Sequence, residues 1–482
     1  MSWLQKSDEE LTAWANTPGM EDYKHVIRGI IREKQHVLSP QEERLLAMGG
    51  EVSATAKNVF SMLNDADLRF PKVKLPNGEE VEITHGSYRL LMDNPDRNVR
   101  KDTYEKMYGV YQQHINSIAA MYGGSVKKDV YYATVRSYPS CIEAKLQGID
   151  VPLAVYDSLI ETVRKNIPVM ERYLNLRKKC LGVDELYMYD VYTPLIEGVE
   201  TKLSYEDAKQ LVYEGLAPLG KEYQAMLKQA YEQGWIDVEE NRGKTSGAYC
   251  WGVYGVHPYV LLNYQEDLDY AFTIAHELGH AMHSYYSDKN NSYLNAGYEI
   301  FVAEVASTVN EVLLTKHILN TTQDENIKKY IVNNYLEQFR TTVFRQTMFA
   351  EFEKISHAMA ERGEALTVES MNEQYAQLNA YYYPGVTQDE LIKMEWARIP
   401  HFYNSFYVYQ YATGFSAAVA IAEGILKGNS PADYLEFLKT GGRDYPIELL
   451  KIAGVDLSTP APVQACMEAF EGALNQLENM LK

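Results

Sequence analysis

The stretch His276-Glu277-Leu278-Gly279-His280 combines two imidazoles and a carboxylate at helical spacing. Residues four apart lie on one face of an α-helix, so the ring nitrogens of His276 and His280 can converge on one metal ion. Glu277 lies about 100° further around the helix, where its carboxylate can reach a water bound to that ion. The stretch therefore predicts a helix that supplies two ligands and a general base to a zinc site.

The surrounding run, Asp267 to Ser287, predicts the helix that contains this motif. Its apolar residues with helical spacing are Ala271, Ile274, Ala275, Leu278 and Met282. Their recurrence indicates a mostly buried helix. With 11 His and 66 acidic residues among 482, the motif would arise by chance about 0.04 times per chain. Gly279 lowers helix stability by roughly 1 kcal/mol relative to Ala, so its place between the ligands predicts a closely packed second backbone.

The segment from Phe301 to Glu311 offers a third ligand. Glu304 lies among small and apolar residues that predict a buried helix, where an unpaired carboxylate is unfavourable and metal coordination removes the penalty. Ser307 and Glu311 follow on the same face and can hydrogen-bond to the ligands and orient them. Glu311 can equally be a solvated or salt-bridged helix carboxylate. A His, His, Glu site with one open position is typical of zinc hydrolases.

His283 extends the histidine cluster by one helical turn. It lies about 20° from His276 and about 60° from His280 around the helix axis, so it can line the site. We favour a structural or ligand-orienting role for His283 over a role as a metal ligand.

Several further stretches match a known family in order and spacing. These stretches are Arg242–Tyr249, Pro258–Asn263, His276–His283, Phe301–Glu311, Arg398–Tyr403 and Tyr407–Tyr411. Through them the chain resembles the zinc oligopeptidases that include oligoendopeptidase F and thimet oligopeptidase, the first more closely. Members usually have roughly a hundred further residues at the amino end, about one small domain. We therefore expect this chain to lack most of the helical amino-terminal lobe that helps to wall the substrate channel.

The resemblance implies a mainly α, zincin-type fold with a small β-sheet beside the active site and a deep substrate channel. It implies one Zn²⁺ per chain, with His276, His280 and Glu304 as ligands and Glu277 as the base. We expect residues 1–482 to form a single catalytic region. Within it, residues 1–200 form the helical remnant of the amino-terminal lobe and the channel wall, and residues 201–482 form the zinc-containing lobe.

The family resemblance also implies that a His and one or two Tyr from the carboxy-terminal aromatic stretch stabilise the oxyanion of the tetrahedral intermediate. Phenol and imidazole groups can donate hydrogen bonds to developing negative charge. His401 is the candidate histidine. Alternative alignments favour Tyr407 or Tyr411, so both are candidates. In a chain with 39 Tyr, these tyrosines can instead belong to an aromatic core.

The segment from Gly247 to Gly255 is rich in glycine and in residues that favour strands, which predicts a strand or loop edge near the site. Such an edge can bind a peptide backbone by strand addition. The candidate substrate-binding residues are Gly247, Tyr249 and His257. His257 can instead cap the loop.

Together these features predict a cytoplasmic zinc endopeptidase that hydrolyses internal bonds of short oligopeptides, with a metal-bound water as nucleophile and Glu277 as general base. One alternative is a zinc carboxypeptidase or dipeptidyl carboxypeptidase on the same scaffold, in which Arg398 or Arg242 recognises a free carboxylate. The other alternative is a non-catalytic peptide-binding protein. An intact Glu277 argues against the second alternative, because a binding protein has no need for a base.

Composition limits the partners. The formal net charge of -20 argues against nucleic acid, whose phosphates would be repelled. Four cysteines, far apart in sequence, match neither a disulfide framework nor a CxxC zinc site. The amino terminus lacks an apolar signal region and no apolar run approaches membrane-spanning length, so we expect no membrane association and a cytoplasmic location. Short peptides are the expected partners, and a homo-oligomer is left open.

Helical patterns dominate the rest of the chain. Val155 to Leu181 predicts a helix broken or kinked near Pro168. Ser204 resembles the first residue of a capping box, and Ser430-Pro431 predicts an N-cap followed by the first helical residue. The run from Pro462 to Leu481 predicts an amphipathic helix.

Overall fold

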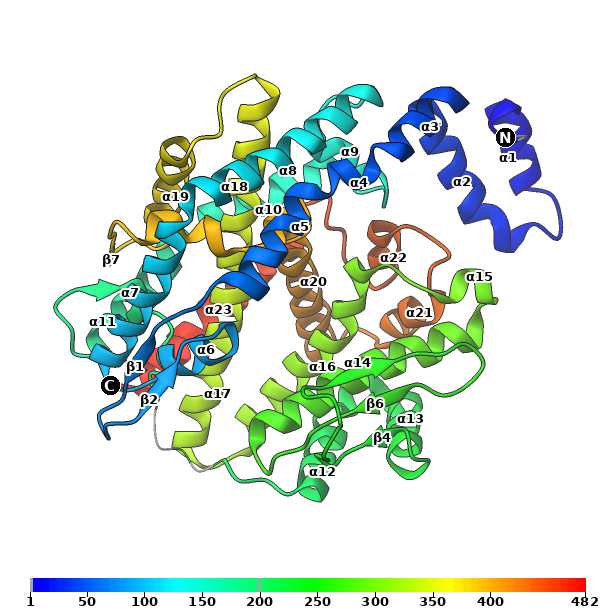
Figure 1. The fold of residues 1–482 in the computed structure, drawn as a ribbon. Coiled ribbons are helices and arrows are strands. Elements are labelled where there is room, and N and C mark those ends of the chain that lie inside the picture. The colour runs from blue at the N-terminus through cyan, green and yellow to red at the C-terminus, as the bar shows by residue number, and fades with distance from the viewer. Residues whose placement is uncertain (1–2, 197–198, 200) are drawn as a thin grey trace.

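The computed structural model describes residues 3–196, 199 and 201–482, and helices dominate this part of the chain (Figure 1). The helices are α1 (Asp8–Ala15), α2 (Lys24–Glu33), α3 (Pro40–Met48), α4 (Gly50–Ser53), α5 (Thr55–Ser61), α6 (His85–Met92), α7 (Arg97–Gln113), α8 (Ile115–Val135), α9 (Cys141–Gln147), α10 (Leu153–Lys165), α11 (Ile167–Cys180), α12 (Tyr205–Gly215), α13 (Gly220–Glu232), α14 (Leu268–Asn290), α15 (Tyr293–Ala296), α16 (Ile300–Thr321), α17 (Glu325–Gln338), α18 (Arg345–Glu361), α19 (Val368–Tyr382), α20 (Tyr409–Leu426), α21 (Ala432–Thr440), α22 (Pro446–Ile452) and α23 (Ala461–Met480). The strands are β1 (Lys72–Lys74), β2 (Glu80–Glu82), β3 (Leu186–Tyr187), β4 (Ile236–Asp237), β5 (Tyr249–Trp251), β6 (Tyr259–Leu261) and β7 (Val386–Thr387). The predicted mainly α fold with a small sheet is confirmed.

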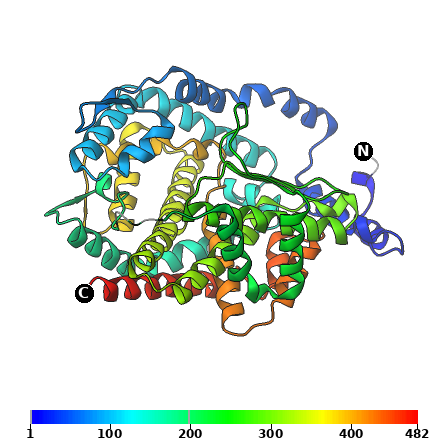
Figure 2. The same cartoon turned by 90° about the horizontal axis from the view of Figure 1, so that it is seen from below.

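Two groups of helices lie on either side of the long helices α16 and α20. In Figure 1, α5, α7, α8, α18 and α19 lie on one side, and α12, α13, α14 and the sheet of β4 to β6 lie on the other. Figure 2 separates the same two groups and shows the two chain ends far apart. The carboxy-terminal helix α23 packs against α17 and α20, so it supports the centre of the molecule from behind.

One continuous hydrophobic core runs from Phe60 to Leu477 and joins both groups. Helix α16 packs against α12, α14 and α20, which explains why it is apolar around most of its circumference. The first helices are less integrated. Leu11, Ala15 and Ile27 form a separate small cluster that packs α1 on α2.

Helix α14 contains the histidine motif and confirms the helix predicted for Asp267 to Ser287. It begins after Asp267, whose side chain accepts a hydrogen bond from the Asp269 N–H at 2.9 Å and caps the helix. The five apolar residues predicted for its buried face are all buried. This face packs against α12, α16 and α21, which fixes the direction of the opposite face.

Gly279 lies where α14 crosses α16. A Cβ atom at this position would lie 2.5 Å from the Cα of Ser307 and 2.6 Å from the carbonyl oxygen of Ala306. The prediction of a closely packed backbone at Gly279 is therefore confirmed. Only a residue without a side chain permits this helix separation.

The sheet beside α14 has the order β4-β6-β5. Strand β5 pairs antiparallel with β6, with Tyr249 opposite Leu261 and Trp251 opposite Tyr259, and β4 pairs with β6 in parallel. Both β5 and β6 contact α14. Val260 is buried, whereas Tyr249, Trp251 and Tyr259 are exposed. One face of the sheet therefore covers α14, and β5 is a free edge, as the sequence predicted.

The other helix boundaries mostly follow the predicted signals. The region from Val155 to Leu181 forms two helices, α10 and α11, and Pro168 lies in the first turn of α11, where its missing N–H is tolerated. Ser204 caps α12 by accepting from the Asp207 N–H at 3.2 Å. The start predicted at Ser430-Pro431 is wrong by one residue, because α21 begins at Ala432 and Ser430 accepts from the Ala432 N–H at 3.2 Å.

We expect Gly279→Ala to destabilise the protein by about 1–3 kcal/mol, because its methyl group forces α14 and α16 apart. Gly472→Ala is the matched control, since Gly472 also lies inside a helix but a Cβ there meets nothing within 4 Å. The control should be neutral or more stable by up to about 1 kcal/mol. Urea unfolding of both variants measures the difference, and equal midpoints would show that the crossing tolerates a side chain.

Candidate active site

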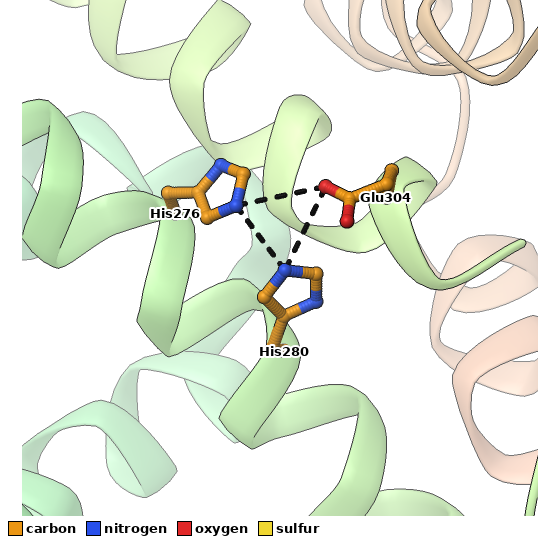
Figure 3. A group of neighbouring side chains, drawn as sticks. All are labelled: His276, His280 and Glu304. Carbon is orange, nitrogen blue, oxygen red and sulfur yellow. Dashed lines mark hydrogen bonds and ion pairs between the residues drawn. The ribbon is translucent and has the colours of Figure 1, made fainter. Parts of the chain in front are cut away.

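The side chains of His276, His280 and Glu304 converge from α14 and α16 (Figure 3). The Nε2 atoms of the two histidines are 3.2 Å apart, and the Glu304 Oε2 lies 3.6 Å from one and 3.7 Å from the other. Tetrahedral zinc with bonds of about 2.0–2.2 Å separates its ligand atoms by about 3.3–3.6 Å. The three donor atoms therefore have the chemistry and spacing of a zinc site with an open fourth position.

A hydrogen bond behind His276 fixes which nitrogen faces the site. His276 Nδ1 lies 2.5 Å from Glu311 Oε1, and Glu311 Oε2 accepts from Gln338 Nε2 at 2.9 Å. The carboxylate holds the Nδ1 proton, so the Nε2 lone pair points at Glu304 and His280. The interpretation of Glu311 as a solvated carboxylate is wrong, because its side chain is only 15% exposed and contacts the histidine.

Glu304 is oriented from its own helix. Ser307 Oγ donates to the backbone oxygen of Glu304 at 3.0 Å and lies 3.2 Å from its Oε2. The expectation that Glu304 is buried is wrong, since its side chain is 43% exposed. This exposure is compatible with a ligand that borders an open metal position accessible to substrate.

The two facing histidines have opposite pKa shifts. Burial lowers the pKa of His276, but the hydrogen bond and charge of Glu311 outweigh it and raise the pKa to about 9. Burial and the neighbouring His276 charge lower the pKa of His280 to about 4.

Glu277 is buried beside the ligands, with 6% of its surface exposed. Burial raises the pKa of its carboxyl to about 7, against the charge of His276 and a hydrogen bond from the backbone N–H of Cys250, which both lower it. A carboxylate with a pKa near neutrality is suited to accept and return a proton. Strand β5 contributes Cys250, so the sheet edge and the candidate base are direct neighbours.

His283 is separate from the donor set. Its ring stacks on Tyr298 at a centroid distance of 3.6 Å and lies 5.3 Å from Phe437. The side chain is buried, and burial followed by the nearby His280 lowers its pKa to about 3. The structure thus places His283 in a packing role one turn below the ligands.

His401, Tyr407 and Tyr411 form an aromatic cluster. The ring centroid of His401 lies 6.5 Å from that of Tyr407 and 6.1 Å from that of Tyr411, and the two tyrosine rings are 5.4 Å apart. Burial, followed by Tyr407 and the charge of Glu304, raises the pKa of Tyr411 above its ordinary value, so its hydroxyl stays protonated and can donate a hydrogen bond. Burial lowers the pKa of His401, so a neutral imidazole can donate its N–H.

The neighbouring tyrosines of the same stretch have other positions. Tyr403 is buried and stacks on Phe60 at a centroid distance of 4.1 Å, and Tyr409 is buried beside Tyr156 and Phe301. The aromatic core interpretation therefore applies to Tyr403 and Tyr409. Both Tyr407 and Tyr411, by contrast, are partly exposed beside His401.

The candidate substrate-binding residues lie along or near the free edge. Gly247 has a φ of 86°, and its carbonyl accepts from Asn263 Nδ2 at 2.8 Å, which fixes the entry into β5. Tyr249 is 46% exposed on the outer face of β5. His257 stacks on Trp235 with an interplanar angle of 5°, and its Nδ1 lies 2.8 Å from the Pro258 oxygen, so it packs the loop before β6.

The two arginines proposed to recognise a free carboxylate differ. Arg398 Nε donates to Tyr108 Oη at 3.2 Å, its guanidinium lies 5.0 Å from the Tyr88 ring centroid, and it is 3.6 Å from Glu395 Oε1. Arg398 is therefore already committed to a buried network. Arg242 is exposed and forms no ion pair with the residues that the structure describes.

Local sequence signals missed two neighbours of the site, Gln338 and Cys250. Gln338 reaches Glu311 from α17, and Cys250 reaches Glu277 from β5. Neither belongs to a motif with its partner, because contact depends on how separate elements pack. No helix in the described part of the chain combines the length and apolar character needed to cross a membrane.

Comparison with known proteins identifies the family of this chain. Residues 90–469 match the model of peptidase family M3, and residues 3–70 match the amino-terminal model described as oligopeptidase F. Oligopeptidase PepF of Bacillus subtilis is 48% identical over 95% of this chain and 69% of its own length. An oligoendopeptidase F homolog of Lactococcus lactis is 42% identical over 100% of this chain and 80% of its own.

A solved structure extends the similarity to the fold. Oligoendopeptidase-F from Enterococcus faecium superposes with a TM-score of 0.83 at 39% identity, over 100% of this chain and 82% of that structure. The family models, the relatives and the solved structure all name peptidases or oligopeptidases. The chain therefore belongs to peptidase family M3 and is a metallo-oligopeptidase.

Proposed function

We propose that this peptidase is a zinc-dependent endopeptidase that cleaves internal bonds of short oligopeptides, with Glu277 as general base. The observation that supports it best is the convergence of His276 Nε2, His280 Nε2 and Glu304 Oε2 within 4.8 Å of one another, beside the buried Glu277. We assign one Zn²⁺ per chain to these three donors. When bound, zinc supplies a Lewis acid that activates a water and polarises the scissile carbonyl.

Glu277 moves the proton. Its carboxylate accepts a proton from the attacking water and then returns it to the nitrogen of the departing amine. Burial raises the pKa of this carboxyl, which makes its protonated form easier to reach near neutral pH. No covalent acyl-enzyme forms in this scheme, since the nucleophile is water.

His401, Tyr407 and Tyr411 stabilise the oxyanion in our proposal. What supports this role is that the three rings lie together, with the His401 centroid 6.5 Å from Tyr407 and 6.1 Å from Tyr411, and that all three side chains are at least partly exposed. Each donor becomes more effective as negative charge develops on the carbonyl oxygen.

We propose that the substrate backbone pairs with the free edge of β5. Edge pairing uses main-chain hydrogen bonds, so it binds peptides with little demand on their side chains. Gly247 and Tyr249 belong to this edge, and His257 supports it through Trp235. In our proposal α12, α13, α14 and the sheet belong to the zinc-containing lobe, and α5, α7 and α8 form the opposite wall of the channel together with α18 and α19, so the walls do not divide at residue 200.

The carboxypeptidase alternative is less favoured. Recognition of a free carboxylate needs an available cation, and of the two candidates Arg398 is held by Glu395 and Tyr108, which leaves only the exposed Arg242. The alternative of a non-catalytic binding protein is weakened by the buried base at Glu277, whose position serves no purpose in binding alone.

We expect Glu277→Gln to lower kcat by about 100- to 10,000-fold, because the amide cannot accept the proton. The substrate is an internally quenched peptide of about eight residues, blocked at both ends so that only internal cleavage is possible. Zinc content should remain near that of the wild type. Glu436→Gln, an exposed carboxylate without an ion pair among the described residues, is the matched control. A zinc-loaded wild type that leaves the blocked peptide intact would contradict the endopeptidase assignment.

We expect Glu311→Ala to weaken zinc binding by about 10- to 100-fold, since His276 loses the carboxylate that orients its ring. Glu311→Gln should show a smaller loss, because its amide oxygen can still accept from Nδ1. Competition with a chromophoric chelator measures the affinity independently of activity. Unchanged zinc affinity in Glu311→Ala would show that the ring is held by packing alone.

We expect Tyr407→Phe or Tyr411→Phe to lower kcat by about 100- to 1,000-fold if the lost hydroxyl is an oxyanion donor. Tyr403→Phe serves as the control, because Tyr403 is buried against Phe60 and its hydroxyl has no partner among the described residues. Steady-state kinetics of the three variants on the same peptide separates the donors from the core tyrosines. Wild-type kcat in both test variants would remove the two hydroxyls from the mechanism.

A further inference from the structure

The turn between His401 and Tyr407 has an unusual backbone. Phe406 has a φ of 56°, which is in the left-handed region that non-glycine residues with bulky side chains rarely adopt. The residue after this turn is Tyr407, one of the proposed oxyanion donors. The backbone angles of Phe406 determine the direction of the chain at Tyr407. Contacts that fix the backbone of Phe406 therefore also position the Tyr407 side chain.

A buried carboxyl group holds this backbone. The Phe406 N–H donates to Glu353 Oε1 at 2.9 Å, and Glu353, on α18, is 0% exposed. Among the described residues, Glu353 forms no ion pair and its Oε2 has no hydrogen-bond partner. Burying an acid without a cation is unfavourable, and among the described residues the one hydrogen bond of the Glu353 side chain goes to the strained turn.

A second carboxylate holds the preceding residue. Ser405 Oγ donates to Asp129 Oδ2 at 2.5 Å, and His357 Nε2 lies 3.3 Å from the same oxygen. The His357 Nδ1 is 2.8 Å from the backbone oxygen of Glu353, and its ring centroid lies 4.5 Å from that of Phe406. Asp129 of α8 thus binds Ser405, and Glu353 of α18 binds Phe406.

We propose that Glu353 and Asp129 form a clamp that holds Ser405 and Phe406 and thereby positions Tyr407 for catalysis. This inference rests on the proposed role of Tyr407 in the oxyanion site. Glu353 touches neither metal ligands nor His401 and acts only through the turn, so it is a positioning residue. Burial raises the pKa of Glu353 well above its ordinary value, so glutamine is its closest neutral replacement.

The test compares Glu353→Met with Glu353→Gln. Methionine fills a similar volume but cannot accept from the Phe406 N–H, whereas the glutamine oxygen can. We expect Glu353→Met to lower kcat by about tenfold or more, with KM within about twofold of the wild type, because the aim of Tyr407 matters in the transition state. Glu353→Gln should restore kcat to within about threefold of the wild type. Zinc content and the melting temperature are measured on each preparation.

The same substitution in the Tyr407→Phe background separates positioning from stability. If the clamp acts through the hydroxyl, Glu353→Met causes little further loss of kcat there. An equal loss in both backgrounds, or a lower melting temperature with wild-type kcat, would overturn the clamp. If Tyr407→Phe itself keeps full kcat, the proposed oxyanion role fails first and the clamp with it. If Tyr407→Phe lowers kcat but Glu353→Met does not, the clamp is rejected and the proposed role of Tyr407 stands.

A milder variant covers the case in which Glu353→Met does not fold. Ser405→Ala removes only the hydroxyl that Asp129 holds, at a buried position that accommodates the smaller residue. We expect kcat to fall by about threefold or more with KM unchanged. If Tyr407→Phe lowers kcat, a wild-type kcat in Ser405→Ala contradicts the clamp.

Discussion

The close approach of α14 and α16 at Gly279 is the contact on which the site depends. With the backbone of Ala306 and Ser307 so near to Gly279, the two histidines of α14 face the carboxylate of Glu304 on α16. Metal ligands must lie within a few tenths of an ångström of their ideal places. A larger residue at the crossing would shift one helix by more than this tolerance.

Hydrogen bonds then fix what the helix crossing brings together. Asn310 Nδ2 donates to the Ala275 carbonyl at 2.9 Å and ties α16 to α14 immediately before the first ligand. Glu311 and Gln338 hold His276 from behind, and Ser307 contacts Glu304. These groups are mostly buried, where hydrogen bonds are strong and an unpaired partner is unfavourable. The donor set is therefore supported from the side opposite to the open metal position.

The candidate oxyanion donors depend on a different kind of support. His401 lies in a short 3-10 helix (Pro400–Tyr403), and Tyr407 lies in the irregular link between that helix and α20. Asp129 of α8, which is partly exposed, and the buried Glu353 of α18 fix this link by binding Ser405 and Phe406. The metal donors are thus held by helix packing, whereas Tyr407 depends on side-chain hydrogen bonds to the strained turn that precedes it.

Local sequence was sufficient for the parts of the site whose geometry is periodic. The spacing of His276 and His280 places both on one face of any helix, and the apolar residues around them predict that the helix is buried. Gly279 likewise predicts a closely packed backbone. Glycine destabilises a helix interior, so its presence there indicates that a side chain would not fit. The family resemblance then assigned Glu304 and directed attention to Tyr407 and Tyr411.

Only the tertiary structure decided which distant residues touch. Glu311 orients His276 across 35 positions, Gln338 reaches Glu311 from another helix, and Glu353 binds Phe406 across 53 positions. It also separated the core tyrosines Tyr403 and Tyr409 from the exposed pair. The physical reason is that helical spacing relates residues only within about four positions, whereas these contacts depend on crossing angles and packing between whole helices.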